Sequence, residues 1–117
     1  MPREYEWHEL VNLTGHDVTL IGWDDQAWTI PSVGQLRVYS NAEPMGMARG
    51  EVHVPVLDIV EQRLSIEAEP KPDTLYIVSG IVAAKARRDD FVVPSRVVRD
   101  KSGRAIGCRA LARVVTT

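Results

Sequence analysis

Short stretches in which apolar and polar residues alternate, separated by glycine, proline and acidic pairs, constrain this chain most strongly. Such alternation is typical of half-buried β-strands, and the separating residues favour turns. Residues 10–14 and 17–22 are rich in strand-forming side chains. Residues 23–26 (Trp-Asp-Asp-Gln) predict a turn, which residues 27–30 follow as a further strand. We therefore expect a β-hairpin here, with Trp23 exposed at its tip.

Alternation continues through the middle of the chain. Strands are predicted around residues 36–39, 52–56 and 63–68. Pro55 indicates an edge strand or a bulge, because proline cannot donate a hydrogen bond to a central ladder. Residues 41–51 contain two glycines and a proline, so we expect a loop between the first two of these strands.

A continuous apolar run, Leu75–Val78, predicts a buried strand, and Ser79-Gly80 follows it directly. The alanine-rich residues 81–88 predict a short helix, which Ser79 can cap by accepting from backbone amides two or three residues further on. Residues 96–100 and 104–114 flank Lys101-Ser102-Gly103, which predicts a hairpin with Gly103 at positive φ.

These elements predict a mainly β, α+β fold: a small barrel or rolled antiparallel sheet with one short helix packed across it. The chain has 117 residues, which is the size of one domain, so we expect residues 1–117 to form a single domain. Exposed edge strands in so small a β domain favour a homo-oligomer, because subunit pairing protects them.

Charge is divided unevenly along the chain. Residues 1–58 carry a net charge of −6, and residues 59–117 carry +4. In a compact domain the two halves would form one acidic and one basic face, which is either an ordinary solvated surface or a basis for head-to-tail self-association. Aromatic side chains, which stack on nucleic-acid bases, fall mostly in the acidic half, and this argues against a nucleic-acid partner. The acidic N-terminus without an apolar stretch and the lack of a long apolar run predict a cytoplasmic protein with no membrane partner.

Metal and catalytic motifs are missing. The three histidines have no metal-ligand spacing and Cys108 is the single cysteine, so we expect no metal and no cofactor. Ile106, Cys108 and Ala110 alternate with Gly107 and Arg109, which predicts that the first three side chains share one face and point into the core. No catalytic residue is assigned, and a small enzyme using His16 as a general base stays an alternative.

Five stretches together resemble a group of small, mostly uncharacterised proteins from actinobacterial phages, prophages and bacteria. They are residues 12–18 (NLTGHDV), 30–34 (IPSVG), 74–79 (TLYIVS), 88–95 (RDDFVVPS) and 99–107 (RDKSGRAIG). The resemblance implies a phage setting, in the cytoplasm of a bacterial host. By analogy, the protein would sequester a signal of host defence.

Polar residues within and beside these stretches predict a ligand pocket. The candidate ligand-binding residues are Asn12, Thr14, His16, Ser79, Arg88, Asp90, Arg99 and Arg109. Arginine forks and free amides at a helix start suit a small anion such as a nucleotide. The leading prediction is therefore a non-catalytic anion-binding protein. The alternative is a protein-interaction or assembly module without a ligand pocket.

Arg109 gives the sharpest prediction. Counting outward from the turn places Arg99 opposite Ala105 and sets Arg109 beside the small residues Ala105 and Gly107. Because small neighbours leave space, we expect Arg109 to be partly buried and to reach an anion or an acidic side chain.

Overall fold

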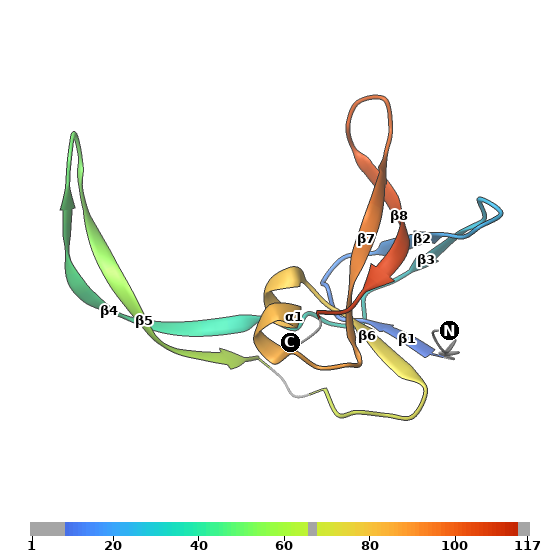
Figure 1. The fold of residues 1–117 in the computed structure, drawn as a ribbon, viewed down its shortest axis with the longest axis horizontal. Coiled ribbons are helices and arrows are strands. Elements are labelled where there is room, and N and C mark those ends of the chain that lie inside the picture. Colours follow the sequence, from blue (N-terminus) through green and yellow to red (C-terminus); the bar gives the residue numbers. More distant parts are fainter. Residues whose placement is uncertain (1–8, 66–67, 115–117) are drawn as a thin grey trace, which may run out of the picture.

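The computed structural model describes residues 9–65 and 68–114 and is mainly β, with one short helix (Figure 1). Its elements, in chain order, are β1 (Glu9–Asn12), β2 (Val18–Ile21), β3 (Ala27–Ile30), β4 (Val38–Arg49), β5 (His53–Leu64), β6 (Thr74–Ile77), α1 (Gly80–Ala86), β7 (Phe91–Arg99) and β8 (Ala105–Ala112). Six strands form a nearly closed, barrel-like sheet in the order β1-β6-β7-β8-β2-β3. The predicted fold class is confirmed.

The sheet is mixed. Hairpins β2–β3 and β7–β8 are antiparallel, as expected from their turn residues. The other contacts are parallel: β6 with β7 across helix α1, and β1 with β6 and β2 with β8 between segments far apart in the sequence. The turn at 22–26 leaves Trp23 fully exposed, which confirms the prediction for that side chain.

Strand β6 lies at the centre of the packing, and all four of its residues are buried. Tyr76 belongs to a hydrophobic cluster under helix α1, which also contains Val82 and Phe91. Leu75 and Ile77 point to the opposite side, into a second cluster within the sheet. Because both faces of β6 are covered, its sequence is a continuous apolar run rather than an alternating one.

Helix α1 begins as predicted and ends earlier than predicted. Ser79 is its N-cap, and its hydroxyl oxygen accepts from the Val82 amide at 3.4 Å. The helix stops at Ala86 because Arg87 adopts a left-handed conformation, with φ of 50°. The predicted extension to residue 88 is therefore wrong, since a left-handed residue interrupts the helical hydrogen bonds.

The β7–β8 ribbon, meaning β7, its turn and β8, has the predicted pairing next to its turn, but the register shifts by one residue at Ile106, where Val98 pairs with Gly107. Arg99 pairs with Ala105, and Gly103 has φ of +87°. Cys108 is buried, as its alternation predicts, but Ile106 is 49% exposed, so its predicted core position is wrong. The reason is that this end of the ribbon projects beyond the body of the molecule (Figure 1).

The largest departure from expectation is the arm, which we define as residues 38–64. The prediction of a loop at 41–51 is wrong: β4 and β5 are each 12 residues long and pair with one another. Both are edge strands, so Pro44 and Pro55 are tolerated although they lack an N–H. The predicted strand at 63–68 is also wrong: β5 ends at Leu64, Ala68 is not in a strand, and residues 66–67 lie outside the described residues.

The arm makes the molecule extended. Among the residues that the structure describes, the arm touches the body only at its base, where Val38 and Leu64 pack against the cluster under α1. The radius of gyration is 18.0 Å, whereas a compact domain of this length has about 13 Å. Within the described residues, no helix is long and apolar enough to cross a membrane.

Candidate functional site

The first group of predicted site residues is built around Asn12, which is 1% exposed. Its side-chain amide donates to the carbonyl oxygens of Ile30 (2.9 Å) and His16 (2.8 Å). Its Oδ1 accepts from the backbone amide of Thr14 (3.0 Å) and lies 2.7 Å from the Thr14 hydroxyl. These contacts use both donors and both acceptor positions of the amide. Asn12 and Thr14 therefore organise the 12–17 turn, while the exposed His16 ring contacts the Asp17 carbonyl at 2.9 Å.

Ser79 lies at the start of α1 and its hydroxyl caps the helix. The helix has seven residues. The Ser79 hydroxyl accepts from the Val82 amide, and in the described part of the chain Ser79 shares no hydrogen bond with the other predicted site residues.

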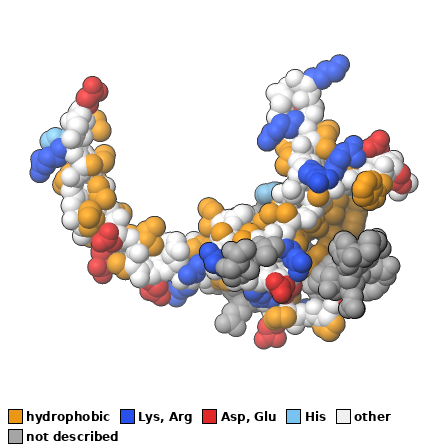
Figure 2. Space-filling model, viewed as in Figure 1, with side chains coloured by type: hydrophobic (Ala, Val, Ile, Leu, Met, Phe, Trp, Pro, Cys, Tyr) orange, Lys and Arg blue, Asp and Glu red, His pale blue; other side chains and the backbone are white. Residues whose placement is uncertain are grey.

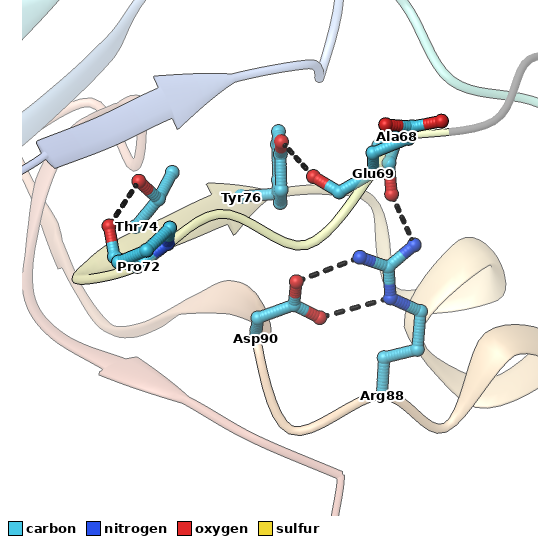
Figure 3. Close-up of polar contacts among 7 residues, drawn as sticks. All are labelled: Ala68, Glu69, Pro72, Thr74, Tyr76, Arg88 and Asp90. Atoms are coloured by element: carbon cyan, nitrogen blue, oxygen red, sulfur yellow. Dashed lines mark hydrogen bonds and ion pairs between the residues drawn. The ribbon is translucent and has the colours of Figure 1, made fainter.

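Arg88 and Asp90 form a two-pronged ion pair (Figure 3). Arg88 Nε donates to Asp90 Oδ1 at 2.9 Å, and Nη2 donates to Oδ2 at 2.6 Å. Nη1 donates to the Ala68 carbonyl, and the guanidinium stacks on the Phe91 ring at 4.2 Å. The whole fork is thereby engaged in holding the 68–69 segment against the body, where the Tyr76 hydroxyl also donates to the Glu69 carbonyl.

Arg99 lies at the far end of the β7–β8 ribbon and donates to the Gly103 carbonyl at 3.0 Å. Next to it, the Asp100 carboxylate organises the turn by accepting from the Ser102 hydroxyl and from the amides of Ser102 and Arg104. The hydroxyl contact and then the Arg104 amide hold the pKa of the Asp100 carboxyl below its usual value.

Arg109 reaches an acidic neighbour, as predicted, but its side chain is 45% exposed. Nη2 lies 2.8 Å from Asp25 Oδ1, and Nη1 donates to the Gly22 carbonyl at 3.3 Å. Asp25 has a positive φ of 62° in the β2–β3 turn. The contact therefore ties that turn to β8.

The eight predicted residues thus belong to five separate groups. In the described part of the chain, no hydrogen bond or ion pair joins one group to another. Within those same ranges, no three His, Cys, Asp or Glu side chains gather as metal ligands would. Most of these polar side chains form hydrogen bonds within turns, a helix cap or ion pairs. Those structural contacts account for most of the polar residues from which a pocket was predicted.

A hollow of about 500 Å³ lies beside Arg109 and is lined by residues of β1, β2, β6, β7 and β8. Its walls are mostly apolar and include Leu10, Leu20 and Leu111. Arg109 and Arg113 supply the charged part of the lining. The sequence prediction contained Arg109 but not the leucines, because the candidate residues were chosen for their polar side chains.

Sequence reasoning predicted part of β5, the strand at 52–56 with an edge position at Pro55, but missed the arm as a paired unit. Figure 2 shows hydrophobic side chains along it, and past its base they contact no other described part of the molecule. The exposed ones are Tyr39, Met45, Met47, Val52, Val54, Val56, Leu57, Ile59 and Val60. The valine alternation at 52–56 was the available signal, but proline and glycine concealed its partner strand.

Comparison of the chain with known protein families, with curated proteins and with solved structures gives no match.

Proposed function

We propose that this protein is an interaction and assembly module, and that it associates with copies of itself through the arm. The observation that carries the proposal is the arm's exposed apolar surface: Leu57 is 51% exposed and Ile59 is 61% exposed. Apolar patches of this extent on a soluble protein usually mark a binding surface.

The arm also lacks internal support. A two-stranded hairpin is only marginally stable in water unless a third strand or another layer covers it. Past its base, no described element covers either face of β4–β5, and every residue from Tyr39 to Arg63 is exposed. A partner lying on the arm would supply the missing layer.

The size of the arm matches a subunit interface. A 12-residue strand pair is about 40 Å long and 10 Å wide, which gives about 400 Å² per face. Covering both faces would bury about 800 Å², which is the area that one partner contributes to a standard interface.

The arm is built for contact through its faces rather than its edges. Pro44 and Pro55 remove backbone donors from β4 and β5, and the register is irregular near Asn41 and near Pro44. Prolines and bulges hinder the addition of further strands. Side chains on the faces are therefore the expected contact.

The test is the mass of the native protein, measured by native mass spectrometry and by light scattering over a concentration series. The wild type should form an oligomer. A variant in which a two-residue Asn-Gly turn replaces residues 43–58 should be a folded monomer by circular dichroism. Val56→Lys should weaken assembly, whereas Ile81→Lys, a control at an exposed apolar residue of the body, should not. A wild type that stays monomeric at 100 μM or a shortened variant that assembles normally would overturn the proposal.

A second candidate function is the binding of a small anion, as the resemblance and the arginines suggest. The hollow beside Arg109 and Arg113 supports it, because apolar walls with a few charged groups are typical of ligand sites. Cyclic nucleotides, ATP and octanoate would then raise the melting temperature, and Arg113→Ala would remove the shift. No shift with any of these at millimolar concentration would exclude them as ligands. Sequestration of a host defence signal would belong to this candidate.

A further inference from the structure

We infer that the arm of one subunit docks on the β7–β8 ribbon of the next, through acidic side chains of the arm and basic side chains of the ribbon. This inference rests on the proposed self-assembly and adds the surface that receives the arm. Both elements project from the body, so each is accessible to a second copy (Figure 1).

The ribbon is strongly basic. Residues 91–112 contain five arginine or lysine residues and a single acidic residue, Asp100. Arg109 is paired with Asp25. Arg96, Arg99, Lys101 and Arg104 are exposed, and within the described residues they form no ion pair. A surface with several unpaired cations and one carboxylate favours an acidic partner.

The arm carries the complementary charge. Its residues 38–64 contain four acidic and two basic side chains. Glu43 and Asp58 lie directly opposite one another across the strands, and neither forms an ion pair in the described structure. Like charges in this position repel and destabilise a strand pair. A cation from a partner would turn that repulsion into attraction. Glu61 pairs with Asn41 nearer the base of the arm, on the same face, and adds a third carboxylate.

Apolar side chains accompany the charges on both surfaces. Asp58, Val56 and Val54 alternate along β5, so the acidic position and the two exposed valines share one face. On the ribbon, Val97 and Ile106 are exposed, and each lies two residues from an arginine, Arg99 or Arg104.

A hollow of about 270 Å³ beside Val97 and Ile106, bordered also by His16 and Asp17, offers space for an aliphatic side chain. Each surface therefore combines charged side chains, acidic on the arm and basic on the ribbon, with exposed aliphatic side chains.

The arm and the ribbon are different surfaces, so their contact is heterologous. Each subunit would give its arm to one neighbour and receive an arm from another. Such contacts build a closed ring when the rotation between subunits closes, and an open filament when it does not.

The experiment uses complementing charge reversals in the full-length chain. Glu43→Lys with Asp58→Lys reverses the arm, and Arg99→Glu with Arg104→Glu reverses the ribbon. Each double variant alone should associate on the order of a hundredfold more weakly than the wild type. An equimolar mixture should recover assembly, because each variant then finds an opposite charge on the other. The control for the arm variant is Glu69→Lys with Asp89→Lys. It makes the same change in net charge on the body, and it should assemble as the wild type does.

The outcomes separate this inference from the proposed function. If the shortened arm abolishes assembly but the reversed variants assemble normally, or their mixture does not recover, the arm docks elsewhere and the inference is wrong while the proposed function stands. If the wild type is a monomer at every concentration, both are wrong.

A measurement on the unaltered protein covers the case in which a variant misfolds. A carbodiimide joins carboxylates to amines in direct contact. In wild-type oligomers it should link Lys101 of one subunit to Glu43, Asp58 or Glu61 of another, as identified by peptide mass spectrometry. Links between subunits through Lys71 or Lys85 alone would contradict the inference.

Discussion

Replacing Asn12 with alanine tests how much of the body depends on one buried amide. The substitution removes two donors to the Ile30 and His16 carbonyls and the acceptor for two groups of Thr14. Each hydrogen bond contributes about 1 kcal/mol net, and a buried group left without a partner costs about 1–3 kcal/mol. We therefore expect a loss of about 3–5 kcal/mol in the free energy of unfolding. That is a large part of the roughly 5–15 kcal/mol that stabilises a typical domain.

The assay is urea unfolding followed by far-ultraviolet circular dichroism. Protein concentration is held constant, because association would add to the apparent stability. Asn41→Ala is the matched control: Asn41 is exposed on the arm and donates a single side-chain hydrogen bond, to Glu61. Its loss should cost no more than about 0.5–1 kcal/mol. Equal losses for the two variants would refute the conclusion that Asn12 organises the turn.

Three further predictions follow from the described contacts. Arg88→Lys should lower stability by about 1–3 kcal/mol in thermal unfolding, because lysine cannot keep both bonds to Asp90 and the stacking on Phe91; an unchanged melting temperature would contradict this role. Gly103→Ala should cost about 1 kcal/mol in urea unfolding through its positive φ alone, since a Cβ there meets nothing, whereas Gly80→Ala, with equal space and an ordinary φ, should cost nothing. Asp100→Asn should destabilise the protein only at higher pH. Folding lowers the pKa of Asp100, so its ionised form stabilises the turn above the unfolded pKa of 3.8. This stabilisation is lost as the pH falls through the folded pKa. A difference between wild type and Asp100→Asn that persists unchanged at pH 2 would be inconsistent with that assignment.

Local chemistry made several elements predictable. The Leu75–Val78 run, the Ser79 cap and the Gly103 turn depend on residues within a few positions of one another, and each was confirmed. Arg109 was correctly expected to reach an acidic neighbour. Its partner, Asp25, could not be identified, because the two residues are 84 positions apart and meet only through the parallel contact of β2 with β8.

The sequence by itself determined the class of fold, the hairpin turns and the cap of the helix, since alternation, glycine at positive φ and a capping serine act over short distances. Only the tertiary structure decided the parallel pairings and the use of the polar residues, because hydrogen-bonding partners such as Asn12 and Ile30 are brought together by folding. It also decided the arm. Judged from neighbouring residues alone, proline and glycine indicate a break in a strand. The two free edges of the arm tolerate them, and those edges exist only once β4 has paired with β5.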